Sequence, residues 1–93
     1  MTITVVLPTY LHAFAGGRGV VELSCSAATV GDALRALGDV YPGVYARVLT
    51  EQGEVRQHVN VFCGGESIRY TGGLSTAIAD GAELFIVPAV SGG

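Results

Sequence analysis

Glycine pairs divide this chain into short apolar segments. The pairs are Gly16-Gly17, Gly64-Gly65, Gly72-Gly73 and Gly92-Gly93. The first three lie between apolar runs, where glycine supplies the positive φ angles that tight turns require. No apolar run follows the fourth pair, so no turn requires it. We therefore expect short strands joined by turns, followed by a narrow terminal segment that carries a carboxylate on a residue without a Cβ.

Composition restricts the class of protein. A chain of 93 residues with 49% hydrophobic residues and a mean hydropathy of +0.50 predicts one folded domain. Apolar runs such as Leu84–Val87 are much shorter than the roughly 20 residues of a membrane span. With no signal-peptide pattern at the start, we expect a cytoplasmic protein that does not enter a membrane. The net charge of −3 and five scattered arginines argue against nucleic-acid binding and favour a partner with a basic docking surface.

The reactive side chains do not form a recognisable catalytic or metal-binding pattern. Cys25 and Cys63 are too few and too far apart for a metal site, so no bound metal is expected. Both are expected to pack as small hydrophobic residues, with a reactive thiol as the alternative. His12 and His58 are expected to have surface or packing roles. No Ser/His/Asp, Cys/His or paired-carboxylate set is evident, so we do not expect an enzyme.

The first half of the sequence predicts two strands and a helix. Over residues 2–7, Ile3, Val5 and Leu7 fall on one face and Thr2, Thr4 and Val6 on the other, which predicts a strand. A glycine-rich connection leads to a second strand at 20–24, which suggests a hairpin. Thr29 can cap a helix, with Asp32 as its partner three residues later. Val30, Ala33, Leu34, Leu37 and Val40 then form one apolar stripe. Pro42-Gly43 is expected to end this helix, the only long one.

The second half predicts strands at 59–63 and 83–87, with a short segment at 68–70 and a helical turn near 74–76 between them. No regular pattern is evident over residues 44–58. Alternation predicts the residues of both strands that point toward the core. They are Val59, Val61 and Cys63 in the first strand and Leu84 and Ile86 in the second. Phe62, Phe85 and Val87 are consequently expected to share the opposite face of the sheet, where they can form a docking surface for partner proteins.

The strand order ββαββ and three sequence stretches resemble the ThiS/MoaD family of ubiquitin-like sulfur carriers. The stretches are Leu7-Pro8-Thr9, the segment at residues 72–81 and the segment at residues 88–93. Within the family, they are most similar to the carriers of actinobacterial cysteine biosynthesis. The resemblance implies an α+β, β-grasp fold in which a mixed sheet of four to five strands packs on one helix. Residues 1–88 would form this domain, with parallel first and last strands at the sheet centre, and residues 89–93 a flexible tail.

The resemblance also implies a chemistry for the tail. An E1-like adenylyltransferase/sulfurtransferase would use ATP to adenylate Gly93 and convert it to a thiocarboxylate. Ala89, Val90, Ser91 and Gly92 would thread into partner active sites. A PLP-dependent cysteine synthase, or another sulfur-accepting synthase, would take the sulfur, and a JAMM-type zinc peptidase would release cysteine. The chain itself would be a co-substrate with no bound cofactor.

Alternatives remain open at the level of sequence. The sulfur could instead serve molybdopterin, the thiazole of thiamine or a thio-containing natural product. The chain could also be a ubiquitin-like modifier joined to lysines of other proteins, although it has no lysine with which to form branched chains on itself. A third possibility is an interaction module with an inert tail.

Overall fold

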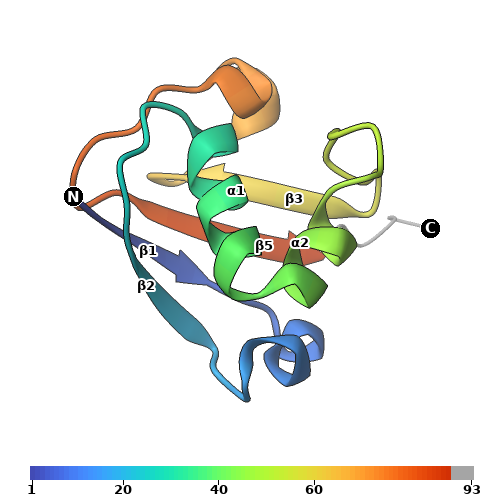
Figure 1. The fold of residues 1–93 in the computed structure, drawn as a ribbon. Coiled ribbons are helices and arrows are strands. Elements are labelled where there is room, and N and C mark those ends of the chain that lie inside the picture. The colour runs from blue at the N-terminus through green and yellow to red at the C-terminus, as the bar shows by residue number, and fades with distance from the viewer. Residues whose placement is uncertain (89–93) are drawn as a thin grey trace.

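The computed structural model describes residues 1–88 and shows a mixed sheet covered on one face by helices (Figure 1). The five strands have the order β2-β1-β5-β3-β4. Their bounds are β1 Thr2–Val6, β2 Val20–Ser24, β3 Val59–Cys63, β4 Glu66–Ser67 and β5 Glu83–Pro88. The helices are α1 Val30–Val40 and α2 Pro42–Val48, with 3-10 turns η1 Thr9–Ala15, η2 Ile68–Tyr70 and η3 Gly73–Ser75. The expected α+β fold, with a mixed sheet of four to five strands, is confirmed.

The two central strands, β1 and β5, run parallel, as the family resemblance implies. Val5 lies beside Leu84 in this pairing. On its other side β5 pairs antiparallel with β3, where Val61 lies beside Ile86. Leu84 and Ile86 are 0% and 2% exposed, because they point toward the helices. The last strand is thereby fixed between two neighbours and against the core.

The connection between β1 and β2 is more ordered than the sequence suggested. Residues expected to form a loop instead form η1, whose Leu11 and Ala15 are fully buried. Gly16 ends this turn in the left-handed conformation, with φ of 65°, and Gly17 follows with φ of 86°. The glycine pair thus makes the turn that its sequence predicted.

Helix α1 begins as predicted. The hydroxyl of Thr29 accepts a hydrogen bond from the backbone N–H of Asp32 at 3.2 Å, and the Asp32 carboxylate accepts one from the backbone N–H of Ala28. The bond from Ala28, with further contributions from Thr29 and the ion pair with Arg35, holds the pKa of Asp32 below its usual value. One member of the predicted stripe is wrong: Val40, in the last turn, is 57% exposed.

A second helix was not expected. Pro42-Gly43 was interpreted as the end of helical structure, but Pro42 is the first residue of α2. Proline is well suited to this position, because the first N–H of a helix has no partner within the helix. Val44 and Val48 of α2 are 0% and 1% exposed and join the core, so the sheet packs on two helices rather than one.

The core is entirely apolar within the described residues. The same part of the chain contains no helix of the length and hydropathy that crossing a bilayer requires.

Candidate functional site

The end of β5 is the first part of the candidate site. Its buried residues Leu84 and Ile86 anchor the strand, while Val87 and Pro88 are exposed at its end. Pro88 lies opposite Val59 of β3, so the chain leaves the sheet beside the start of that strand. The tail residues Ala89, Val90, Ser91, Gly92 and Gly93 lie outside the described residues, and their roles stay predictions.

The outer face of the sheet is the second part. Phe85 and Val87 are 36% and 38% exposed on the face opposite the helices, and Phe62 is half-buried directly across from Phe85. The predicted placement of these three residues on one face is therefore confirmed. Their proposed docking role stays a prediction.

Two further valines extend this apolar surface. Val6 of β1 lies beside Phe85, and Val20 of β2 lies beside Val6, so one row crosses four strands from Val20 to Phe62. Val20 is 52% exposed. We call the row Val20, Val6, Phe85 and Phe62, together with Val87, the outer apolar surface. Alternation placed Val6 on the outward side, but only the register between strands shows that these residues are neighbours.

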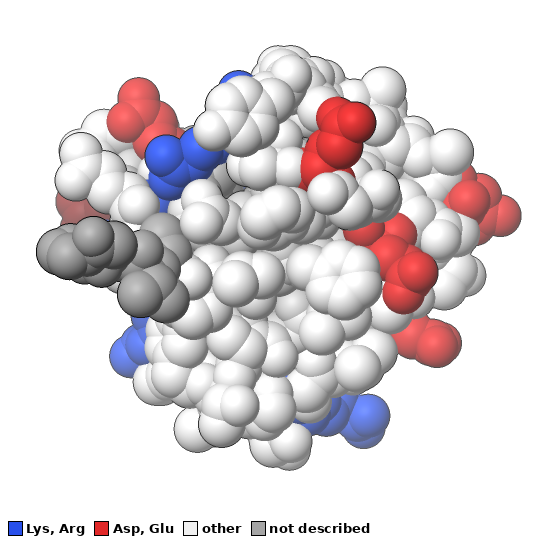
Figure 2. Space-filling model, turned by 180° about the vertical axis from the view of Figure 1, so that it is seen from behind, with Lys and Arg blue, Asp and Glu red and all other residues white. Residues whose placement is uncertain are grey.

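Charge is absent from most of this face (Figure 2). Most of the acidic side chains in that view lie toward one side, away from the middle of the sheet. An uncharged surface bordered by charged residues is typical of a protein-binding face, since the apolar centre is desolvated on binding while the rim stays hydrated.

A hollow of about 480 Å³ lies next to this surface. Phe62 and Asn60 contribute from β3, and Tyr70, which is 85% exposed, contributes from η2. An exposed tyrosine beside a phenylalanine is a common feature of interface anchors. The sequence alone does not single out Tyr70, because the segment that carries it has no periodic pattern.

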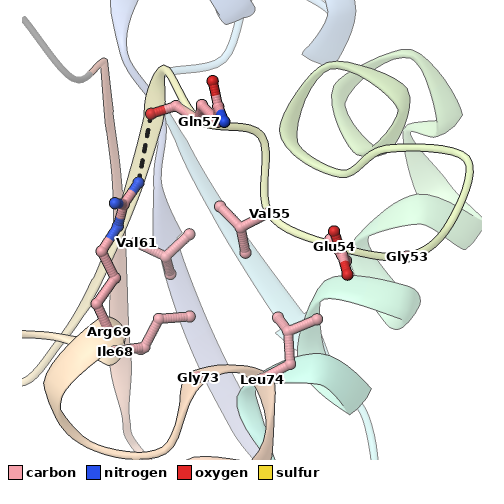
Figure 3. A pocket seen from close by; sticks show the side chains of 9 residues that line it. All are labelled: Gly53, Glu54, Val55, Gln57, Val61, Ile68, Arg69, Gly73 and Leu74. Carbon is pink, nitrogen blue, oxygen red and sulfur yellow. Dashed lines mark hydrogen bonds between the residues drawn. The ribbon is translucent and has the colours of Figure 1, made fainter. Parts of the chain in front are cut away.

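A second hollow, of about 410 Å³, lies between β3, the loop before it and the turns η2 and η3 (Figure 3). Val55, Val61, Ile68 and Leu74 supply its apolar walls, and Arg69 lies at one side. Glu54 is the one carboxylate that lines it, and no Ser, Cys or His does so among the described residues. Its lining therefore contains no nucleophile–base pair.

The cysteines and histidines occupy separate positions. Cys25 and Cys63 are free and half-buried against the core, in partial agreement with the expected packing role. His12 makes a 3.1 Å hydrogen-bond contact with the carbonyl of Leu7, and His58 is exposed. Within residues 1–88, no three side chains suited to a metal ion come together.

The geometry is that of a β-grasp body whose central last strand has an exposed end, and its sequence matches a known family model. The ThiS family model matches residues 5–93. The chain belongs to the ThiS family. It is 39% identical over 95 residues to the sulfur carrier protein CysO of Mycobacterium tuberculosis, with all of both chains covered.

Solved structures agree with this family membership. The Amycolatopsis orientalis BexX/CysO complex contains a chain that matches this ThiS-family protein with a TM-score of 0.86 and 35% identity, covering 98% of this chain and 99% of that one. The small archaeal modifier protein 3 of Haloferax volcanii is 44% identical over 66 residues, which are 71% of each chain. These relatives are named as carriers or modifiers, and the ThiS-family protein described here is likewise a ubiquitin-like protein rather than an enzyme.

Proposed function

We propose that this ThiS-family protein is a sulfur carrier that is activated at the carboxylate of Gly93. The observation that carries the proposal is the match to CysO over the whole of both chains, together with a family model that extends through residue 93. In this proposal residues 1–88 are the body that partners recognise, and residues 89–93 are the tail that they react with.

The proposed chemistry begins with a poor electrophile. The Gly93 carboxylate attacks the α-phosphate of ATP, pyrophosphate leaves, and an acyl-adenylate forms on an E1-like enzyme. A sulfur nucleophile then attacks the carbonyl carbon, the bond to the AMP oxygen breaks, and AMP leaves with the electron pair. When the sulfur comes from a persulfide, a thiol must then cleave the resulting S–S bond to release the thiocarboxylate. ATP is thus used by the partner, and this chain needs no bound cofactor.

Ala89, Val90, Ser91 and Gly92 fit the proposed threading role through their small size. None has a side chain larger than valine, and the final two positions have no side chain at all. A narrow channel can enclose such a segment, and a carbonyl without a neighbouring Cβ is open to attack from both sides. We place the chemistry in the cytoplasm, where ATP is available.

We assign partner docking to the outer apolar surface. It includes Phe62, Phe85 and Val87, the three residues for which the sequence predicts this role. Its support is exposure: Phe85 and Val87 are more than a third exposed on a face with little charge (Figure 2). The complex of CysO with BexX is an example of a related protein bound to a partner.

Cysteine is the proposed destination of the sulfur, because CysO is a relative that matches over the whole of both chains. The thiocarboxylate would attack an aminoacrylate on a PLP-dependent cysteine synthase. A shift of the acyl group from sulfur to nitrogen would then give an amide, which a JAMM-type zinc peptidase hydrolyses after Gly93. A molybdopterin, thiazole or natural-product synthase would use the same tail.

A modifier is the second candidate, and the similarity to the small archaeal modifier protein 3 favours it. Here the activated Gly93 carbonyl would be attacked by a lysine of another protein, and AMP would leave. Mass spectrometry of protein purified from native cells distinguishes the two functions. A carrier ends in a thiocarboxylate, whereas a modifier is joined to target lysines through an isopeptide bond at Gly93.

The proposal is tested by comparing a chain that ends at Gly93 with one that continues into a C-terminal tag. Activation requires a free carboxylate at Gly93, so only the first chain should support ATP–pyrophosphate exchange by the activating enzyme. An N-terminally tagged chain is the matched control and should be active. Equal exchange with the C-terminally extended chain would refute activation at Gly93.

A further inference from the structure

Three arginines gather where the chain leaves the sheet, and the proposed chemistry does not use them. Arg69 follows β4, Arg56 precedes β3, and Arg47 lies in the last turn of α2. We call these three residues the arginine cluster. Two of its members contact Val59 at the start of β3, which lies opposite Pro88: the Arg69 side chain donates to the Val59 carbonyl, and the Arg56 carbonyl accepts from the Val59 N–H.

Arg69 lies along the edge of β3. Its Nη2 atom is 3.3 Å from the carbonyl oxygen of Gln57 and 3.4 Å from that of Val59, and Figure 3 shows the contact with Gln57. Because Val59 is paired with Pro88 on its other side, one residue separates the Arg69 guanidinium from the end of β5. The side chain is held in place and remains exposed.

Arg56 and Arg47 are held in the same manner. Arg56 donates from Nε and Nη2 to the carbonyl oxygen of Ala46, at 3.2 and 2.9 Å. Ala46 is in the last turn of α2, where carbonyls lack partners within the helix. Arg47 donates to the carbonyl oxygen of Gly43 at 3.1 Å, and its guanidinium carbon lies 3.5 Å from the centre of the Phe14 ring.

All of these partners are neutral, so the positive charges remain uncompensated. Within residues 1–88, the one ion pair joins Arg35 to Asp32 at the start of α1. Glu51 and Glu54 lie on the turn before β3, but neither forms an ion pair with the cluster in that part of the chain. The guanidinium groups are therefore positioned without being neutralised.

Acidic residues are concentrated at the other end of the sheet. Asp80 accepts a hydrogen bond from the first residue of β1, Glu83 begins β5, and Glu66 pairs with the last residue of β3. A net charge of −3 suggested a basic partner surface, yet the arginine cluster lies at the end from which the tail leaves.

We propose that the arginine cluster binds acidic side chains on the partner protein, at the rim of the channel that the tail enters. This inference rests on the proposed function. Each guanidinium has five N–H donors, and the carbonyl contacts use only part of them, so a forked face is left for a carboxylate. Since these side chains are already held in place, binding costs less conformational entropy than it would for mobile arginines. Opposite charges also accelerate the encounter and fix the orientation in which the tail approaches.

The first test compares the double variant R56Q/R69Q with the native chain in the activation reaction. We expect the KM for the carrier to rise about tenfold at low ionic strength, with kcat unchanged, because docking rather than chemistry is weakened. The difference should shrink at high salt. R35Q is the control, since Arg35 is an exposed arginine of α1 that pairs with Asp32 and is not a member of the cluster, and it should leave KM unchanged.

If Arg56 and Arg69 only stabilise the fold, their substitution gives a different result. Arg56 and Arg69 bind backbone carbonyls, so their loss can also lower the melting temperature. The variant R56K/R69K keeps both charges while losing most of these hydrogen bonds. Its KM should therefore lie between those of the native chain and R56Q/R69Q, because the charge is kept while the guanidinium fork is lost. A native KM for R56Q/R69Q at low salt, or a loss in R56K/R69K as large as in R56Q/R69Q, would overturn the inference.

The second test does not depend on the activating enzyme. A peptide of consecutive glutamates is titrated into the protein, and backbone amide shifts are followed by NMR. We expect salt-sensitive shifts around residues 47, 56 and 69, and their loss in R56Q/R69Q. Shifts that are spread evenly, or that persist in this variant, would refute the cluster as the binding site. If the enzyme fails to activate the native chain, the proposed function fails, and this titration still decides whether the cluster binds carboxylates.

Discussion

Gly38 determines how closely α1 and α2 can approach. A Cβ at this position would lie 2.8 Å from Cγ of Tyr45 and 2.9 Å from its Cβ. Alanine normally stabilises the interior of a helix by about 1 kcal/mol relative to glycine. A contact this short forces Tyr45 or the helices to move, and such overpacking costs about 1–3 kcal/mol. The cost of overpacking is larger than the gain in helix propensity, so replacing Gly38 by alanine should lower the free energy of unfolding.

We therefore predict that G38A lowers the free energy of unfolding by about 1 kcal/mol, the difference between these two effects. Urea unfolding of the native chain and of G38A measures it. In a Y45G background all the atoms that the new Cβ would meet are absent, and the same substitution should become neutral or stabilising. A stabilising G38A in the native background would contradict the packing described for the two helices.

Sequence reasoning was accurate for single residues whose role is local. Thr29 caps α1 because its hydroxyl needs only an N–H three residues later, and that partner is fixed by the chain itself. Gly38 could not be identified, since its constraint comes from Tyr45 in another helix. Val40 was misassigned to the buried stripe, because its spacing continues the helical period in a turn where the helix no longer faces the core.

At the scale of elements, the start of α1 combines three contacts on Asp32. The backbone N–H of Ala28, the Thr29 side chain and Arg35 all favour the ionised carboxylate, so the pKa of Asp32 is lower in the folded state than its usual value of 3.8. A carboxylate with a lowered pKa stabilises the fold above its unfolded-state pKa. This contribution is lost as the pH falls through the folded-state pKa.

We expect D32N to melt at a lower temperature than the native chain near neutral pH. Below pH 3.8 the two melting temperatures should converge, as the native carboxyl becomes protonated. Thermal unfolding followed by circular dichroism between neutral and strongly acidic pH measures this. D39N, at an exposed position of the same helix, is the control and should show a smaller difference. If the difference in melting temperature between D32N and the native chain does not change with pH, the ionised Asp32 carboxylate does not stabilise α1 as described.

Strands were easier to predict than the second helix. Every inward position of β1, β3 and β5 is apolar, so alternation predicted their faces correctly, whereas the parallel pairing of β1 with β5 was implied by the family resemblance. The helix α2 was missed because proline followed by glycine usually ends helical structure, and here the proline begins a new helix. Only the burial of Val44 and Val48 against the existing core favours that helix, and burial depends on the whole fold.

At the scale of the whole molecule, the outer apolar surface lies on the face opposite the helices, and the arginine cluster lies at the end from which the tail leaves. The first surface was foreseen in part, because alternation identifies outward residues on one strand. The row that joins Val20 to Phe62 depends on the register between strands, which the sequence does not define. The cluster was missed because its arginines are far apart in the chain, and each is held by backbone carbonyls that the sequence does not identify.

We predict that F85T weakens binding to the activating enzyme by about 10- to 30-fold, because it removes an aromatic side chain from the centre of the outer apolar surface. Threonine retains a preference for strands, which limits the effect on folding. V40T is the matched control, since Val40 is an exposed valine on a helix. Isothermal titration calorimetry measures both dissociation constants. Equal weakening by the two variants would argue against docking through this face.

The most direct test of the account is the chemical state of Gly93 after activation. The chain has no lysine and its last arginine is Arg69, so trypsin releases residues 70–93 as one peptide that contains neither Met nor Cys. Oxidation of sulfur side chains therefore cannot imitate the product in this peptide. After incubation with the activating enzyme, ATP and a sulfur donor, we predict that one oxygen is replaced by sulfur and that fragment ions place the change at Gly93. An unmodified carboxylate at Gly93, under conditions in which the same enzyme converts a known carrier, would contradict the account.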